Sequence, residues 1–205
     1  MILYLSVIFV AMIILCVFNI LFGLPFLQSE AWFVVVAVVC GVVFQFVIDG
    51  LFATIVHFLP KKWFSHEKKF FAVSQRERKF LNFCKVKKWK NLVWELGGLG
   101  GFRKNKIENP KDEKYVETFL MECNKGVITH LIDLFVGYLV ILVFPLRFAL
   151  TICLPIAFVN MVLNILPIMV LRYNTPKLLA LHTALSKEKL TNVGSSDKVE
   201  DGQIQ

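Results

Sequence analysis

The sequence predicts an all-α integral membrane protein with four transmembrane helices, arranged as two hairpins joined by a basic, partly helical cytoplasmic segment. Of its 205 residues, 57% are hydrophobic and only 19% are charged, whereas soluble domains average about 45–50% and about 25%. Four apolar stretches approach or exceed the roughly 20 residues that a helix needs to cross a bilayer. The net charge of +8 is concentrated between the second and third stretches. A hydrophobic and basic chain of this kind is typical of a protein on an anionic membrane.

Residues 1–60 form the first predicted hairpin. Its first apolar stretch, residues 1–22, has no basic segment before it and no small-residue cleavage site after it, so we expect an anchor and not a signal peptide. The second stretch, residues 31–59, ends at Pro60 and is longer than one crossing needs. We therefore expect a bend near Gly50, with the remaining residues in or near the membrane interface.

Residues 61–126 form the basic segment. Between positions 61 and 125 there are seventeen Lys and Arg residues but only eight Asp and Glu residues. Trp89 and Trp94 suit a membrane interface, but their five-residue spacing does not put them on one helical face, so we expect a partly irregular segment. The sequence GGLGG at 97–101 lacks the fingerprint of a phosphate-binding loop. It predicts a flexible break, or alternatively a close backbone approach to a phosphate or acyl chain.

Residues 127–172 form the second predicted hairpin, and residues 173–205 form a tail that we expect to be disordered from about residue 186. Because the Lys and Arg residues lie mainly in the basic segment and the tail, the positive-inside rule predicts that both termini are cytoplasmic. The basic segment would then contact the anionic inner leaflet, and nucleic acid is not an expected partner. The five cysteines show no spacing typical of a zinc site or a disulfide framework, and no metal site is predicted.

Polar residues within apolar stretches are costly and often mark a site. Asp49 lies in the second stretch and His57 follows it; His130 and Asp133 open the third stretch on one helical face, as do Asn160 and Asn164 in the fourth. The predicted topology brings most of them to one membrane level, which indicates a polar pocket at the inner leaflet, floored by Asn164. Alternatively, the terminal groups reach toward lipid headgroups and the asparagines bond neighbouring helices.

A histidine held by a carboxylate is a usable general base, and His130 with Asp133 has a suitable spacing. The chain lacks the G-x-S-x-G, H-E-x-x-H and P-loop signatures. The histidine–four residues–aspartate motif of acyltransferases is also missing. The residues alone therefore leave the reaction open.

Four stretches, taken in order, resemble the glycosyl-diaponeurosporenoate acyltransferase family of Gram-positive bacteria, which contains the enzyme of the last step of staphyloxanthin-type carotenoid synthesis. They are LPKKWF (59–64), VKKWK (86–90), MECNKGVITH (121–130) and NILPIMVLRYNTPKL (164–178). The last is the most specific, because arginine, tyrosine and asparagine are followed by a proline. The longer N-terminal hairpin resembles a clostridial or bacillar branch of the family.

This resemblance implies a bacterial cell-membrane enzyme that moves a fatty acyl group to a sugar hydroxyl of a glycosylated carotenoid or related glycolipid. The donor would be a thioester, either acyl-CoA or an acyl carrier, and no bound cofactor is implied. His130 would be the base, oriented by Asp133 or Glu122. The expected substrate-binding residues are Asp49, His57, Lys88, Trp89, Lys90, Asn164, Arg172, Tyr173 and Asn174. One departure is Val127, which stands where the family has a second acidic residue.

Two further functions remain open from the sequence. A non-catalytic membrane protein that binds anionic headgroups, or acts as an assembly subunit, would use the same helices and basic segment. A small transporter fits less well, because the sequence lacks the internal repeat or paired broken helices typical of that class.

Overall fold

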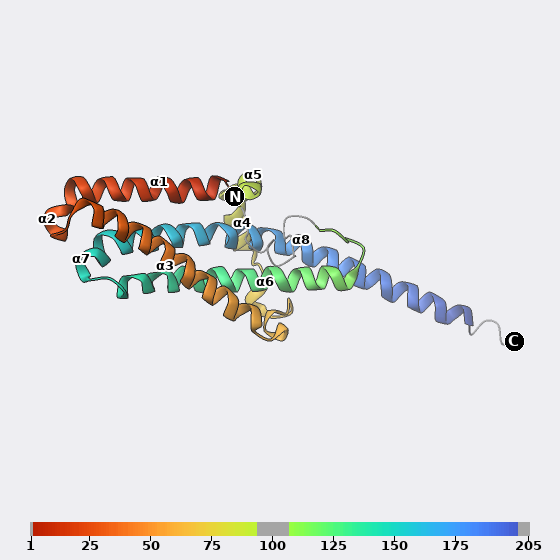
Figure 1. Ribbon diagram of the computed structural model, residues 1–205. Coiled ribbons are helices and arrows are strands. Elements are labelled where there is room, and N and C mark those ends of the chain that lie inside the picture. Colours follow the sequence, from red (N-terminus) through yellow and green to blue (C-terminus); the bar gives the residue numbers. More distant parts are fainter. Residues whose placement is uncertain (1, 94–106, 201–205) are drawn as a thin grey trace.

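The computed structural model describes residues 2–93 and 107–200, and all regular elements in this part of the chain are helices (Figure 1). The first hairpin consists of α1 (Ile2–Phe18), a π-helical turn (Asn19–Gly23), α2 (Leu24–Leu27) and α3 (Ala31–Phe58). The basic segment contains the 3-10 turns Lys61–Phe64 and Lys69–Phe71, α4 (Gln75–Phe83), α5 (Val86–Trp89) and the 3-10 turn Lys90–Leu92. The GGLGG stretch and Trp94 lie outside the described residues.

The second hairpin begins with α6 (Glu113–Val136), which continues as a 3-10 helix (Gly137–Leu142). It returns through α7 (Leu146–Phe148), a π-helical turn (Ala149–Cys153) and the long α8 (Leu154–Glu200). Within the described residues, four helical spans are long and apolar enough to cross a membrane: Tyr4–Leu27, Ala31–Phe58, Glu113–Leu142 and Leu146–Lys189. The predicted fold class, with four membrane-spanning helices, is confirmed.

Two local expectations differ from the structure. Helix α3 runs without interruption through Gly50, because a single glycine costs a helix only about 1 kcal/mol relative to alanine and the apolar residues around it suit a helix. The region beyond residue 186, expected to be disordered, continues α8 as far as Glu200. A polar composition rich in Lys, Glu and Ser predicts a disordered segment, but most of these residues are also compatible with a helix exposed to solvent.

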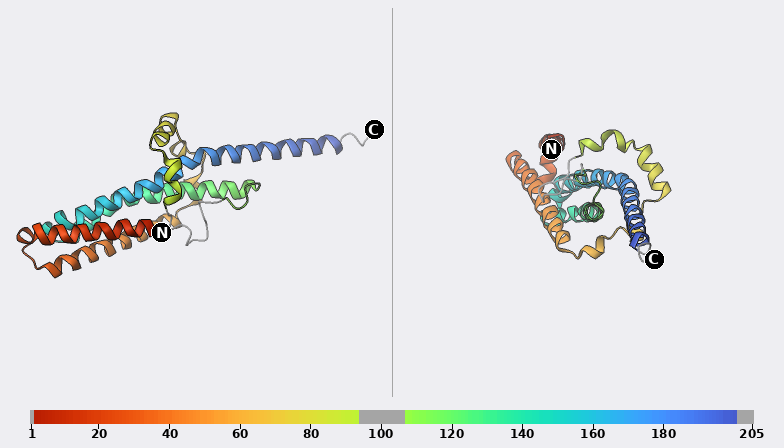
Figure 2. Two further views of the ribbon diagram at one scale, coloured as in Figure 1. Left: turned by 90° about the horizontal axis from the view of Figure 1, so that it is seen from above. Right: turned by 90° about the vertical axis from the view of Figure 1, so that its right-hand side faces the viewer.

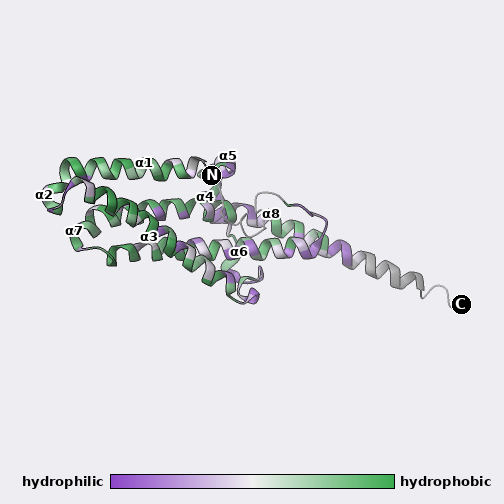
Figure 3. Cartoon of the chain, viewed as in Figure 1, coloured by the Kyte–Doolittle hydropathy of each residue, from purple (hydrophilic) through white to green (hydrophobic). Residues whose placement is uncertain are grey.

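The turns of the two hairpins lie at one end of the bundle, and the polar segments, including the connection from α3 to α6, lie at the other (Figure 1). The end with α2 and α7 is called here the turn end. The end with the N-terminus, α4, α5 and the middle of α8 is called the basic end. Hydropathy follows the same division, because the spans are mainly hydrophobic toward the turn end and hydrophilic residues gather toward the basic end (Figure 3).

The hairpins are held together mainly at the turn end and along α6 and α8. At the turn end, a buried apolar cluster joins the first hairpin to the start of α8, with Val34 and Val38 from one side and Ile152 and Ile156 from the other. Toward the basic end, Phe119, Leu120 and Cys123 of α6 pack against Leu171 and Leu178 of α8.

The first hairpin is fastened to the last membrane span at two points, each four residues before a proline. A proline inside a helix cannot donate a hydrogen bond to the carbonyl four residues earlier. The carbonyl of Leu163, four residues before Pro167, accepts a bond from the hydroxyl of Tyr4. Near the turn end, the carbonyl of Thr151, four residues before Pro155, accepts one from Asn19 Nδ2 at 3.3 Å. Tyr4 of α1 and Asn19 of the following π-helical turn thus each supply one donor to this span.

Candidate functional site

A central cavity of about 770 Å³ lies among α1, α3, α6 and α8, within the size range of small-molecule sites. It is polar toward the basic end and apolar toward the turn end. Six of the residues predicted as site residues line it: Asp49, His57, Glu122, His130, Asp133 and Asn164. The structure thus brings these six residues, from three helices, to the wall of one cavity.

A continuous line of hydrogen bonds, called here the polar chain, runs through the wall of this cavity. The Nδ1 atom of His130 lies 2.8 Å from Asn164 Oδ1. Asn164 Nδ2 donates to the backbone and side-chain oxygens of Asn160, at 3.1 Å each. Asn160 Nδ2 donates in turn to Asp49 Oδ1 at 3.4 Å, and Gln45 Nε2 donates to the same oxygen at 2.9 Å. His130 is thus linked to a carboxylate through two asparagines.

The direction of these bonds assigns the protons of His130. Because the amide nitrogen of Asn164 is used as a donor toward Asn160, its Oδ1 atom is the acceptor for His130. The Nδ1 atom of His130 therefore carries the hydrogen, and in a neutral imidazole the Nε2 atom is then the basic nitrogen. The sequence predicted that Asp133 or Glu122 orients His130; in the structure Nδ1 bonds to Asn164, and the chain of bonds ends on Asp49.

Two deeply buried oxygens in the cavity wall have no hydrogen-bond partner among the described residues. They are Asp133 Oδ1 and Gln45 Oε1, on side chains that are only 4% and 5% exposed. Both residues line the cavity. A buried acceptor without a donor costs about 1–3 kcal/mol of stability. A ligand whose hydroxyl groups donate to these two oxygens would recover this cost as binding free energy.

Gly137 allows the helices around these oxygens to approach closely. A Cβ atom at this position would lie 2.8 Å from Asn160 Nδ2 and 2.8 Å from Gln45 Nε2. Any side chain here would displace two members of the polar chain. The glycine therefore fixes the distance between α6 and the amides of α3 and α8.

The basic end of the cavity is bordered by charged groups. Glu122 accepts a bond from Lys125 Nζ at 3.2 Å, and the ammonium group of Lys125 also lies 5.6 Å from the ring centre of Phe64. His57 lines the same part of the cavity and is exposed. Glu122 is thus engaged with Lys125 at this border.

Arg172, predicted to bind substrate, lies instead in a saturated contact called here the Arg172 clasp. Its Nε and Nη2 atoms donate to the two carboxylate oxygens of Glu77, both at 2.7 Å. Its other three N–H groups donate to the carbonyls of Phe70, Phe71 and Ala72 at 3.0–3.3 Å. A guanidinium has five N–H donors, so all of them are used in holding the basic segment on α8.

The remaining predicted binding residues gather beside this clasp. Lys90 Nζ donates to Asn174 Oδ1 at 3.1 Å and lies 5.8 Å from the ring centre of Tyr173. Trp89 packs with Tyr173 in an apolar cluster, and its Nε1 donates to the carbonyl of Cys84 at 3.0 Å. These residues join the basic segment to α8.

Charge also distinguishes the lysines of this group. Lys88 is exposed to solvent. Burial, together with the nearby ammonium groups of Lys177 and Lys87, lowers the pKa of Lys90 below its usual value. The protonated form of Lys90 is therefore less favourable than that of an ordinary exposed lysine.

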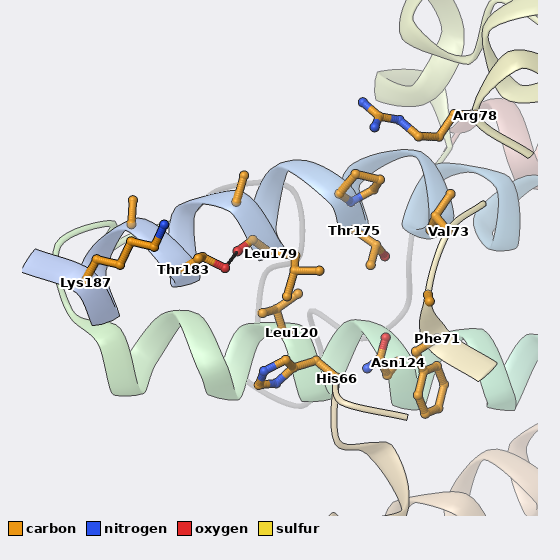
Figure 4. Close-up of a pocket in the computed structure, with 14 residues that line it drawn as sticks. His66, Phe71, Val73, Arg78, Leu120, Asn124, Thr175, Leu179, Thr183 and Lys187 are labelled. Atoms are coloured by element: carbon orange, nitrogen blue, oxygen red, sulfur yellow. Dashed lines mark hydrogen bonds between the residues drawn. The ribbon is translucent and has the colours of Figure 1, made fainter. Parts of the chain in front are cut away.

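A second cavity of about 640 Å³ lies between α6, α8 and the segment around His66 and Phe71. Leu120 of α6 and Leu179 of α8 point into the space between the two helices (Figure 4). Arg78 and Lys187 contribute two exposed positive charges to its border. This cavity combines an apolar interior with a cationic rim.

Val127, which stands where the family has a second acidic residue, lies outside the central cavity. Val127 is buried in the apolar cluster between α6 and α8, and it does not line the central cavity. A carboxylate at this position would lie among Phe119, Leu120 and Leu171, away from the polar chain. The departure from the family pattern therefore affects helix packing.

Sequence patterns did not point to the polar lining residues Tyr4, Gln45 and Lys125, or to Gly137, which packs against Asn160 and Gln45. Gln45 could have been found, because it precedes Asp49 by four residues and so shares its helical face. Asn160 was noted only for sharing the face of Asn164. The role of Gly137 depends on the approach of two other helices, and the sequence of α6 carries no signal for it.

A family model described as glycosyl-4,4'-diaponeurosporenoate acyltransferase matches residues 60–184. The match covers the basic segment, α6 and most of α8, whereas α1 and α3 precede it. Neither the comparison with curated proteins nor the comparison with solved structures gives a match.

Proposed function

This chain belongs to the glycosyl-4,4'-diaponeurosporenoate acyltransferase family, and we propose that it transfers a fatty acyl group from a thioester to a sugar hydroxyl of a membrane-embedded glycolipid. As a member of this family with four membrane-spanning helices, it is a membrane acyltransferase. The observation that carries the proposal is the position of His130, at the polar end of the central cavity and linked to Asp49 through the polar chain.

In the proposed reaction, Nε2 of His130 takes the proton of the sugar hydroxyl while its oxygen attacks the thioester carbonyl. The tetrahedral intermediate then breaks its C–S bond, and the thiolate receives the proton from His130. The products are a sugar ester and a free thiol. Because the amides of Asn164 and Asn160 pass the Nδ1–H bond on toward the Asp49 carboxylate, the polar chain favours the imidazolium form that this step requires.

The acceptor side of the proposal is supported by Asp133 and Gln45. Their unpartnered oxygens are suited to hydroxyl donors, and a sugar has several. Asn160 precedes Asn164 by four residues on α8, a rise of about 6 Å, which is close to the width of one sugar ring. One hydroxyl could thus face His130 while others donate to Asp133 and Gln45.

The donor would approach from the basic end. By the positive-inside rule, the concentration of Lys and Arg there supports a cytoplasmic position for both termini. The cationic rim of the second cavity, with Arg78 and Lys187, is a suitable place for the phosphate groups of an acyl carrier. Glycosylated carotenoid is the acceptor that the family description suggests.

The test is transfer of labelled palmitate from palmitoyl-CoA to a glycosylated carotenoid, with the protein reconstituted in lipid vesicles. We expect His130→Ala to lower kcat by a factor of about 10²–10⁴, the usual contribution of a general base. His182→Ala is the matched control, because His182 contacts His66 and does not line the central cavity. Wild-type turnover in the His130 variant would show that the base has been misassigned.

A further inference from the structure

We propose that the gap between α1 and α3 is a lateral portal, through which the hydrocarbon tail of the sugar-bearing acceptor extends from the central cavity into the bilayer. This inference rests on the proposed function, since it concerns the acceptor of the same reaction. It assigns a task to the N-terminal hairpin, which lies before the residues that match the family model.

The side chains along the gap are both cavity-lining and exposed. On α1 these are Leu5, Ile14 and Phe18, and on α3 they include Phe46 and Gly50. Exposed apolar side chains at the depth of a membrane span face lipid. A cavity with such residues on its rim is open to the bilayer at the side.

Small residues keep this opening wide. Gly50, Ala53 and Ala11 line the cavity on the two sides of the gap. A Cβ atom added at Gly50 would meet nothing within 4 Å, which differs from the crowded positions of Gly41 and Gly137. The space beside Gly50 is therefore not occupied by another part of the described chain.

The backbone arrangement produces the gap. Helices α1 and α3 meet at the α2 turn and diverge toward the basic end (Figures 1 and 2). Tyr4 of α1 donates to Leu163 of α8, and Asn19, directly after α1, donates to Thr151, shortly before α8. Helix α1 therefore stays beside the last membrane span. Only 11% of the α1 span is buried, against 33–39% of the other three spans. The opening lies between these two tethers.

The polar wall identifies the molecule that uses the portal. Asp133 and Gln45 offer unpartnered acceptors to hydroxyl groups, while the residues toward the turn end, such as Met12, Leu15 and Ile156, are apolar. An acyl chain alone would leave the two oxygens unpaired, and a free sugar would leave the apolar part unfilled. A sugar with a hydrocarbon tail satisfies both parts.

The experiment uses hexadecyl glucoside carrying a photoreactive diazirine in the first part of its chain, with the full-length protein in phosphatidylglycerol vesicles. We expect mass spectrometry to find the label on the rim residues of α1 and α3. Gly50→Phe should reduce this labelling at least tenfold, whereas Gly50→Ala should not. Ala53→Phe is a second blocking variant, and unchanged thermal melting shows that each variant folds.

The kinetic counterpart separates the portal from the proposed function. Gly50→Phe should lower kcat/KM for hexadecyl glucoside at least tenfold and leave the preference for donor chain length unchanged. Labelling elsewhere, labelling that Gly50→Phe does not reduce, or a change in donor preference would overturn the portal. If the wild-type protein is labelled at the rim but acylates no glycoside, the proposed function fails and the portal stands.

Discussion

The central cavity and the Arg172 clasp both contain polar side chains near the basic end, but they differ in how completely the hydrogen-bonding capacity of these side chains is used. In the clasp, five donors of Arg172 meet five acceptors, and Glu77 uses both of its carboxylate oxygens. In the cavity, Asp133 and Gln45 each keep a buried oxygen that has no partner among the described residues. The hydrogen bonds of the clasp are all made within the chain, whereas the cavity keeps two acceptors that a ligand with hydroxyl groups would satisfy.

This difference separates two roles that the sequence cannot distinguish. A polar group that is satisfied within the protein contributes to stability, because its hydrogen bonds offset the cost of burial. A buried polar group without a partner reduces stability and is retained where it serves a ligand. We accordingly propose that Arg172 is a positioning residue that holds the basic segment, and that His130, Asp133 and Gln45 form the reaction site.

Among the variants that test the difference between the cavity and the clasp, we expect the largest change in activity for Asp133→Leu. Leucine removes the unpartnered oxygen, so the protein without substrate should gain about 1 kcal/mol of stability. Activity should nevertheless fall about 100-fold, mainly through the KM of the acceptor. Thermal melting and acceptor titrations in the same vesicles measure the two effects. A variant that loses stability and activity together would assign Asp133 to the structural group.

Arg172→Ala should have the opposite pattern, with stability lost first. Glu77 and three carbonyls would lose their donors, at a cost of about 2 kcal/mol. This is less than the roughly 3–5 kcal/mol for breaking a fully buried ion pair, because both side chains are partly exposed. The basic segment should then detach, which faster trypsin cleavage within residues 61–93 would reveal. Arg172→Lys restores the charge but has fewer donors, so intermediate cleavage is expected. Normal protection together with lost activity would indicate substrate binding instead.

Much of the fold was predictable from the sequence, because the length and hydropathy of the apolar stretches determine how many helices cross a bilayer. The level of the site was also predictable, since Asp49, His130 and Asn164 lie at corresponding ends of their stretches. The length of α6 was not, because the helix begins at Glu113, within the segment expected to be only partly helical, and continues into the hairpin predicted from residue 127. Its first turns are polar, and they are helical because Phe119 and Leu120 pack on α8.

The division of the polar residues into two groups could not be predicted. Arg172 and Asn164 are eight residues apart on α8, yet one meets the basic segment and the other meets His130. Whether a side chain is saturated depends on partners up to about a hundred positions away, such as Glu77 for Arg172. Pattern and spacing along one helix contain no information on those partners.

The smallest expected effect concerns the second cavity, where the charges are exposed. Arg78→Ala with Lys187→Ala should raise the KM for palmitoyl-CoA about three- to fivefold, because exposed charges act through a screened field. The effect should disappear at about 1 M salt, where the Debye length falls to about 3 Å. Lys79→Ala with Lys189→Ala is a charge-matched control, since neither residue lines this cavity. Equal effects of both pairs would contradict a specific role of the second cavity and indicate a general attraction between the basic end and the carrier. The polar groups of the Arg172 clasp would then act by saturated hydrogen bonds, those of the central cavity by binding a hydroxylated lipid, and those of the basic end only by long-range attraction.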